Sequence, residues 1–374
     1  MAPDRIVPIN VLIVDDSRVF RTAVRDALTA EADLVIAGSE RNGVRALDFL
    51  RANPVDVVTL DIEMPEMDGL EALKAIAALN QQTGRRIGVI MLSAFTREGA
   101  EQTIKALAAG AFDFIAKPVA DGYDENVAAL RRQLASRIRA CHAALAPSAR
   151  RIVPAAKPVM LAPAVPAVPI QPRVLSPASP APQPRAGTQA VLIGVSTGGP
   201  KALMQMLPVL CRKVSLPILI VQHMPPKFTA SLAESLGRIC SHRVEEATDG
   251  MPVEPGRCYI APGGRHMVVR RTTRVEIGIN DQPPEGGLRP AVDLLFRSAA
   301  PVFDGRCVAV VLTGMGSDGT KGLAPLKRGG VPVICQDEAT SVVWGMPGAA
   351  VAAGLADQVL PLDSIPDAVA RLIR

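Results

Sequence analysis

Short apolar runs, each followed by a stretch with helical periodicity, recur along the first 145 residues. The runs lie at residues 11–14, 35–37, 57–60, 88–92 and 112–115. Each run is too short for a helix and rich in β-branched residues, so each predicts a buried strand. Repeated strand–helix units are typical of a doubly wound sheet, and we expect an N-terminal α/β domain with five parallel strands.

A second alternating region begins near residue 187. Apolar runs at 191–195, 217–222 and 307–312 predict further buried strands, with helical patterns between them. The first run passes through Ser196 and small residues into Pro200, which predicts a strand that turns sharply into a helix. We therefore expect a second, mostly parallel α/β domain over residues 187–374.

The composition changes abruptly between these two regions. Residues 147–185 are dominated by Pro, Ala and Val. Proline lacks a backbone donor and fixes φ, so neither a helix nor an interior strand is expected there. We expect one domain at residues 1–145, a flexible Pro-rich linker at 146–186 and a second domain at 187–374.

Composition also narrows the class of protein. No apolar run is long enough to cross a bilayer and no signal-peptide pattern is present, so we expect a cytoplasmic protein without direct membrane insertion. The six cysteines lack Cys-x-x-Cys spacing, which favours reduced, packed thiols. A net charge of +5 is accompanied by only 3% aromatic residues, so we expect a solvated basic surface and no nucleic-acid partner.

Polar side chains follow the predicted strands of the first domain. Asp15 and Asp16 follow the first strand, Asp61 the third, Ser93 the fourth and Lys117 the fifth. The carboxyl ends of parallel strands meet at one edge, so these side chains should lie close together. Crowded carboxylates call for a divalent cation and a nearby ammonium, and Mg²⁺ with Lys117 meets that need. Asp61 would then attack a phosphoryl donor; the alternative is separate acidic residues on solvated loops.

The motifs around these residues resemble the receiver domain of response regulators. The resemblance rests on Val14-Asp15-Asp16-Ser17, residues 60–69, Leu92-Ser93-Ala94 and Lys117-Pro118. It implies that Asp61 is the phosphoacceptor, and that Asp15 and Asp16 with the Glu63 carbonyl hold Mg²⁺ beside it. It also implies that Ser93 and Lys117 contact the phosphoryl group. Phe114 stands where the family has a switch aromatic, and an ordinary buried strand residue fits that position equally well.

The second domain contains candidates for a hydrolytic site. Residues 194–198, Gly-Val-Ser-Thr-Gly, fit the nucleophile-elbow pattern, and a turn that cradles a phosphate fits them equally well. His223 follows the strand at 217–222 and Asp318 follows the strand at 307–312, so both should share one crevice with Ser196. Ser196 would be the nucleophile, His223 its base and Asp318 the acid that orients the imidazole. The N–H of Met315 would supply an oxyanion donor.

Other residues compete for these roles. His266, in a glycine-rich turn, is the main rival base, although we expect it to line the pocket or to satisfy loop backbone groups. Asp293, in a helical pattern, and Asp337, after a strand, are alternative acids. His142 and His242 are expected at the surface.

Five spaced motifs of the second domain resemble the catalytic domain of chemotaxis protein-glutamate methylesterases. They lie at residues 194–200, 221–225, 261–267, 289–296 and 312–319. The resemblance implies a hydrolase that removes methyl esters from glutamates of chemoreceptor cytoplasmic domains and deamidates selected glutamines, without a cofactor for the esterase reaction. A chemotaxis histidine kinase is the implied phosphodonor. The alternatives are a receiver-controlled hydrolase of another carboxylic ester and a non-enzymatic, phosphorylation-switched binding module.

Overall fold

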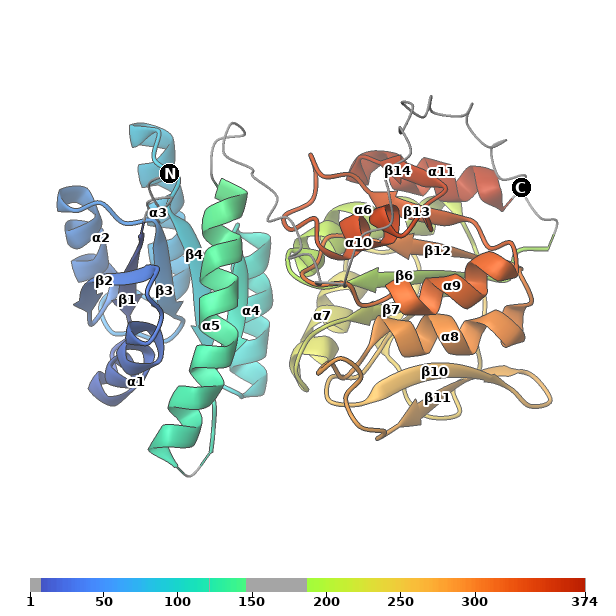
Figure 1. Ribbon diagram of the computed structural model, residues 1–374, viewed down its shortest axis with the longest axis horizontal. Coiled ribbons are helices and arrows are strands. Elements are labelled where there is room, and N and C mark those ends of the chain that lie inside the picture. Colours follow the sequence, from blue (N-terminus) through green and yellow to red (C-terminus); the bar gives the residue numbers. More distant parts are fainter. Residues whose placement is uncertain (1–7, 121, 146–186, 374) are drawn as a thin grey trace, which may run out of the picture.

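The computed structural model describes residues 8–120, 122–145 and 187–373, and the linker expected at 146–186 lies outside them. Figure 1 shows two α/β domains side by side, the N-terminal one coloured blue to green and the C-terminal one yellow-green to red. Within the described residues, no helix combines the length and the apolar character that a membrane span needs.

A parallel sheet of five strands forms the centre of the N-terminal domain, in the order β2-β1-β3-β4-β5. The strands are β1 (Ile9–Val14), β2 (Leu34–Glu40), β3 (Val57–Asp61), β4 (Gly88–Ser93) and β5 (Asp113–Ala116). The helices are α1 (Arg18–Thr29), α2 (Gly43–Ala52), α3 (Gly69–Thr83), α4 (Arg97–Ala108) and α5 (Tyr123–Leu145). Helices α1 and α5 share one apolar cluster with the sheet and α2 to α4 share another, so the sheet is covered on both faces.

The start of α3 shows how local sequence places a candidate functional residue. Asp68 is the N-cap of α3, and Asp68 and Glu71 each accept the other's backbone N–H through a side-chain oxygen, forming a capping box. A Cβ on Gly69 would lie 2.0 Å from the carbonyl oxygen of Asp61. Glycine at residue 69 therefore lets α3 begin directly against the residue that ends β3.

A second parallel sheet, of seven strands in the order β14-β13-β12-β6-β7-β9-β8, forms the centre of the C-terminal domain. Its strands are β6 (Ala190–Val195), β7 (Ile218–Gln222), β8 (Arg243–Glu246), β9 (Arg257–Ile260), β12 (Cys307–Val311), β13 (Val333–Gln336) and β14 (Gln358–Leu360). An antiparallel hairpin of β10 (His266–Arg271) and β11 (Val275–Asn280) lies outside this sheet. The helices are α6 (Gly199–Lys213), α7 (Phe228–Gly237), α8 (Val292–Phe303), α9 (Thr320–Arg328), α10 (Met346–Ala352) and α11 (Ile365–Leu372).

The order of the second sheet places β6 between β12 and β7. Strand β6 pairs in parallel with both neighbours, through Gly194 opposite Val311 and Val195 opposite Gln222. The chain passes from β6 to β7 on one side, and β12 lies on the other. Such a reversal of strand order opens a crevice at the carboxyl ends of the strands, so the loops after β6, β7 and β12 meet there.

The expected fold class is confirmed in both domains, with some differences in element length. Strand β2 spans Leu34–Glu40, whereas the apolar run that predicts it covers only residues 35–37. The last helix of the first domain, α5, runs from Tyr123 to Leu145. Its buried residues include Leu130, Leu134, Ile138 and Cys141, which keep helical spacing almost to its end. All six cysteines are free, and only Cys240 is partly exposed, as expected for packed thiols.

The two domains meet where α4 faces α6 and α7 (Figure 1). The ring of Phe114 on β5 stacks on that of Phe228 on α7, with 4.6 Å between centroids, and the Phe95 ring lies 6.3 Å from the same ring. At the exposed edge, Arg97 pairs with Glu234 at 2.9 Å. The interface therefore has an aromatic centre and a solvated ion pair at its rim.

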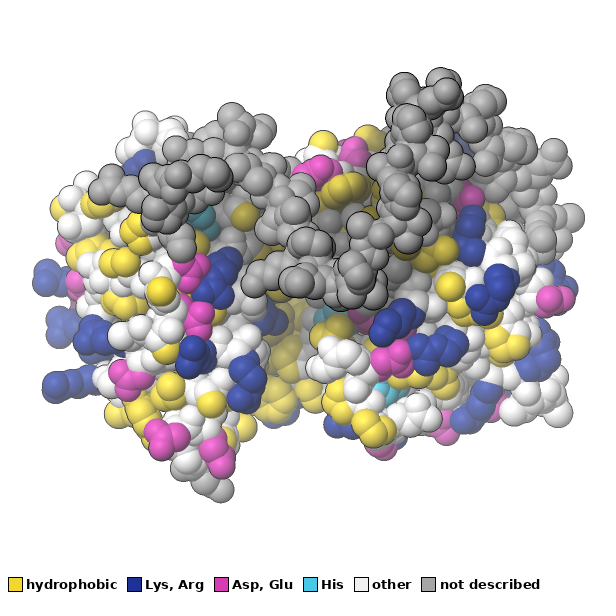
Figure 2. Space-filling model, in the orientation of Figure 1, with side chains coloured by type: hydrophobic (Ala, Val, Ile, Leu, Met, Phe, Trp, Pro, Cys, Tyr) yellow, Lys and Arg dark blue, Asp and Glu magenta, His cyan; other side chains and the backbone are white. Residues whose placement is uncertain are grey.

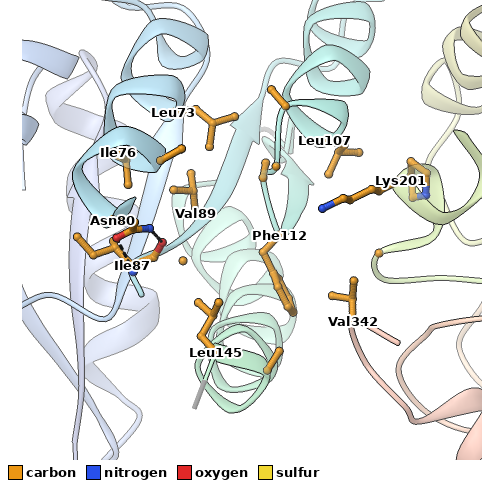
Figure 3. Close-up of a pocket in the computed structure, with 18 of the residues that line it drawn as sticks. Leu73, Ile76, Asn80, Ile87, Val89, Leu107, Phe112, Leu145, Lys201 and Val342 are labelled. Atoms are coloured by element: carbon orange, nitrogen blue, oxygen red, sulfur yellow. Dashed lines mark hydrogen bonds between the residues drawn. The ribbon is translucent and has the colours of Figure 1, made fainter. Parts of the chain in front are cut away.

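A cavity of about 410 Å³ interrupts this interface. Leu73, Ile76 and Phe112 line it from the N-terminal domain, and Lys201 extends into it from the start of α6 opposite them (Figure 3). Figure 2 shows hydrophobic side chains in the hollow between the domains. The two domains are therefore incompletely packed along this stretch.

Candidate functional sites

The turn after β6 places Ser196 at the start of α6. The Ser196 N–H donates to the Thr313 carbonyl at 3.0 Å, and the Ser196 carbonyl accepts the Gly199 N–H at 2.8 Å. Gly198 has a φ of +78°, and a Cβ there would lie 2.5 Å from Val342. This left-handed and crowded position requires glycine, and the sharp strand-to-helix turn predicted from the sequence is confirmed.

His223 and Asp318 form a hydrogen-bonded pair at the same edge of the sheet. Nε2 of His223, which follows β7, lies 2.8 Å from Oδ2 of Asp318, which follows β12. Their side chains are 9% and 7% exposed. The Asp318 carboxylate also accepts the backbone N–H groups of Val292 at 2.6 Å and Asp293 at 3.0 Å, at the N-terminus of α8. A helix N-terminus therefore holds this carboxylate in place.

The surroundings of Asp318 favour its ionised form. Burial opposes ionisation, but the hydrogen bond and charge of His223 and the N–H donors of α8 outweigh it, so the pKa of Asp318 lies below its ordinary value of 3.8. The group is thus a carboxylate near neutral pH. Because Nε2 of His223 makes this contact, Nδ1 is the ring nitrogen left for another partner.

Ser196, His223 and Met315 line one cavity of about 340 Å³. In the part of the chain that the structure describes, Oγ of Ser196 makes no hydrogen bond to His223, so the two share the cavity without that direct contact. The backbone N–H groups of Thr197 and Met315, which line the same cavity, likewise donate to no described residue. Both are therefore available to a negatively charged oxygen in this cavity.

The N-terminal domain covers one side of this cavity. Residues 113–116 of β5 and Arg137 of α5 line it together with Ser196. The hydroxyl of Thr197, the residue after Ser196, donates to Oδ2 of Asp113 at 3.1 Å, and Nε of Arg137 donates to the same oxygen at 3.2 Å. One carboxylate of the first domain is therefore bonded beside the candidate nucleophile of the second.

The rival acids have other partners. Asp293 accepts the Gly322 N–H at 2.6 Å and so caps the first turn of α9. Asp337 accepts the Thr340 N–H at 3.0 Å within its own loop. Neither carboxylate is hydrogen-bonded to His223 among the described residues, which leaves Asp318 as the acid of the pair.

Among the described residues, none of the other histidines is hydrogen-bonded to this pair. His266 is fully buried at the start of β10 and contacts the Pro283 carbonyl at 3.2 Å, so it satisfies a loop backbone group as expected. His142 is partly buried on α5. The prediction that His242 lies at the surface is wrong: it is only 7% exposed. Burial lowers the pKa of His242, although a hydrogen bond to the Leu216 backbone opposes this.

The acidic residues of the N-terminal domain gather at the carboxyl end of its sheet. One oxygen atom from each of Asp15, Asp16 and Asp61 lies within 4.8 Å of the others. Nζ of Lys117 lies 2.7 Å from Asp15 and 2.9 Å from Asp61. Ser93, buried at the end of β4, donates its hydroxyl proton to the Gly99 carbonyl of α4 at 3.1 Å. Hard carboxylate oxygens in this arrangement are suitable ligands for Mg²⁺, and exposure of Asp16 leaves the group open to solvent.

Crowding of these carboxylates changes their acidity. Burial and the charge of Asp15 raise the pKa of Asp61 to about 6, although Lys117 opposes this. Burial also raises the pKa of Asp15. Burial would lower the pKa of Lys117, but the charges of Asp61 and Asp15 outweigh it and raise that pKa. An added cation would therefore favour the ionised form of both buried carboxylates.

Phe114 is buried, as an ordinary strand residue would be, but it packs against the other domain. Its ring is stacked on Phe228 of α7, and its backbone N–H donates to the side chain of Asp113 at 2.8 Å. The residue therefore belongs to the interface between the domains.

One α/β domain carries an acidic pocket, and the second carries a buried His–Asp pair beside a serine. Together these features define a response regulator with an α/β output domain. Residues 11–126 match the family model for the response regulator receiver domain, and residues 191–369 match the model for CheB methylesterase. The chain is 44% identical to the protein-glutamate methylesterase/protein-glutamine glutaminase of group 2 operon from Bradyrhizobium diazoefficiens, over 98% of this chain and 94% of that protein.

A second relative, the protein-glutamate methylesterase/protein-glutamine glutaminase of Azospirillum brasilense, is 42% identical over 96% of this chain and 91% of its own length. The solved CheB methylesterase catalytic domain of Thermotoga maritima is 42% identical, with 50% of this chain and 98% of that structure covered and a TM-score of 0.48. The chain belongs to the protein-glutamate methylesterase/protein-glutamine glutaminase family.

Sequence reasoning missed three polar residues around the cavity: Gln222, Thr313 and Asp113. Each is a residue type that is common in folded cores with no special role. Position along the chain could have indicated two of them, because Gln222 ends a strand next to His223 and Thr313 lies two residues before Met315. Asp113 carried no signal, because its partner Thr197 belongs to the other domain.

Proposed function

We propose that this chain is a phosphorylation-regulated protein-glutamate methylesterase that also deamidates glutamine, acting on the cytoplasmic domains of methylated chemoreceptors. The observation that carries the proposal is that His223, paired with Asp318, lines the same cavity as Ser196. The relatives named above, which match nearly the whole chain, support the choice of substrate.

In the proposed reaction the Ser196 hydroxyl attacks the γ-carbonyl of a methylated glutamate. His223 takes the serine proton through Nδ1, while Asp318 holds Nε2 and stabilises the imidazolium that forms. The N–H groups of Thr197 and Met315 donate to the oxygen that becomes negative. The proton then passes to departing methanol, and the same base activates the water that releases glutamate. An amide reacts in the same way, with ammonia as the leaving group.

The N-terminal domain is the proposed regulator, with Asp61 as the phosphoacceptor and a histidine kinase as the donor. Asp15, Asp16 and Asp61 would hold Mg²⁺, whose positive charge would favour phosphoryl transfer to Asp61. In the unphosphorylated state this domain covers the Ser196 cavity and excludes a receptor helix. Phosphorylation uncovers the cavity by stabilising the arrangement with separated domains relative to the one with the domains in contact, and the open fraction depends on that free-energy difference.

The experiment is a methanol-release assay on methylated receptor fragments, with and without acetyl phosphate and Mg²⁺. We expect release by the wild-type chain to rise on phosphorylation, and Ser196→Ala to abolish release while leaving phosphorylation of Asp61 intact. Release that survives Ser196→Ala would exclude the proposed nucleophile. Hydrolysis of small carboxylic esters without any release from receptor fragments would favour another ester as substrate.

A further inference from the structure

Gln222 is a buried amide that lies between the nucleophile and the base. It ends β7, directly before His223, and is only 2% exposed. Its Nε2 donates to the carbonyl of Ser196 at 3.0 Å and to the carbonyl of His223 at 3.3 Å. One side chain therefore binds the backbone of both residues whose side chains must meet in the proposed reaction.

The orientation of this amide follows from its neighbours. Both contacts are carbonyl oxygens, which accept hydrogen bonds and cannot donate them, so the NH₂ end of the amide must face them. The Oε1 end points at Gly199, where a Cβ would lie 2.0 Å away. Glycine at the first position of α6 therefore makes the room that the amide needs.

Stability alone gives a poor account of a glutamine at this position. Oε1 of Gln222 has no hydrogen-bond partner among the described residues. A buried polar atom without a partner costs free energy that an apolar side chain of similar size would not. The gain that offsets this cost is the fixed position of two loops. These loops follow the paired strands β6 and β7, and the last backbone contact between them is the hydrogen bond from the His223 N–H to the Val195 carbonyl. Beyond that bond, strand pairing no longer holds the two loops together.

We infer that Gln222 is a positioning residue that sets the distance between Ser196 and His223. The inference rests on the proposed roles of those two residues. By holding both carbonyls on one NH₂ group, the amide fixes the loops after β6 and β7 against each other. Gln222 also lines the cavity, but its NH₂ group is occupied by the two backbone carbonyls, so its removal should slow the chemical step more than it weakens substrate binding.

Two variants of the full-length chain test this inference. Gln222→Met keeps the length of the side chain without a donor, and Gln222→Glu replaces the NH₂ group by an oxygen that faces the same two carbonyls. Gln205→Met on α6 is the control, because among the described residues the exposed Gln205 side chain is hydrogen-bonded to Asp363 alone. Each is phosphorylated with acetyl phosphate, and kcat and KM are measured by methanol release alongside Ser196→Ala. Labelling of Ser196 by a serine-directed fluorophosphonate is measured as a second readout.

We expect a kcat that falls by roughly 100-fold in both Gln222 variants, with a KM close to that of the wild type, since a misplacement of about 1 Å costs that much. The labelling rate should fall in parallel, and the control should match the wild type in both assays. A wild-type kcat in either folded variant, or a loss expressed only in KM, overturns the inference. Failure of both variants to fold also overturns it, because the amide would then be structural.

The two readouts separate this inference from the proposed function. If Ser196→Ala still releases methanol, the proposed nucleophile is wrong. If wild-type Ser196 is labelled rapidly but no methanol is released from receptor fragments, the substrate is wrong. In that second case the labelling rates of the Gln222 variants still measure its effect on the serine.

Discussion

Truncation of Phe95 is expected to release the proposed closed state without touching the esterase site. Phe95 lies in the loop after β4, two residues beyond Ser93. Its ring is 6.3 Å from the ring of Phe228, and the ammonium of Lys227 lies 4.8 Å from its centroid. Both partners belong to the catalytic domain, so Phe95→Ala removes contacts that exist only while the domains are together.

The size of the effect follows from these two contacts. An exposed cation–π contact contributes ~0.5–1 kcal/mol and an aromatic pair ~0.5–1.5 kcal/mol, so the closed state should lose roughly 1–2.5 kcal/mol. Since ~1.4 kcal/mol corresponds to a factor of ten, the closed-to-open ratio should fall roughly 5- to 60-fold. The hydrogen bond from Lys227 to the Phe95 carbonyl, at 2.9 Å, is a backbone contact that alanine retains.

The assay is methanol release by the unphosphorylated chain. While the closed state dominates, basal activity is proportional to the open fraction, so it should rise by the same factor in Phe95→Ala. Fully phosphorylated activity should stay unchanged. Arg97→Ala is the matched control, because its exposed ion pair with Glu234 contributes only ~0–1 kcal/mol. Unchanged basal activity in a variant whose Asp61 is still phosphorylated normally would refute this account of the interface.

Three further outcomes are expected. In a thermal melt, Mg²⁺ should raise the Tm of the wild-type chain more above pH 6 than below it, because the pKa of Asp61 is about 6 and a metal ligand must be deprotonated. Asp15→Asn should abolish this rise in Tm. Asp318→Asn should lower kcat for methanol release by roughly 10²–10⁴-fold, because it removes the carboxylate that orients His223; a near-wild-type kcat would count against that role. Gly69→Ala should destabilise the receiver domain by ~1–3 kcal/mol in urea unfolding, since its Cβ would overlap the Asp61 carbonyl, and an unchanged midpoint would contradict this.

The sequence was sufficient to predict both parallel sheets and the residues at their carboxyl edges. Buried parallel strands are continuous apolar runs, and polar residues directly after such runs must lie at the edge where the strands end. That rule correctly brought Asp15, Asp61 and Lys117 together, and His223 and Asp318 as well. It depends only on the order of residues along each strand, which a single sequence contains.

Features that depend on contacts between distant segments were not predictable in the same way. The burial of His242 and the bond between Asp113 and Thr197 arise from packing that no local pattern reports. Gln222 shows an intermediate case. Its place at the end of a strand was readable, but the carbonyl pair that its amide binds depends on where the neighbouring strand ends.

The interface between the domains is weak enough for phosphorylation to separate them. Allosteric coupling energies are typically ~1–3 kcal/mol, so a closed state held much more tightly could not be opened by one phosphoryl group. The interface joins a cluster of three aromatic rings, the buried contact from Thr197 to Asp113, the contacts of Lys227 with Phe95 and an exposed ion pair, and a cavity of about 410 Å³ leaves part of it unpacked. A void of this kind forfeits dispersion contacts that a permanent interface would make. Ser93 ends β4 and Phe95 follows it by two residues, so a change in the position of Ser93 would be passed to the aromatic cluster through a short segment of backbone.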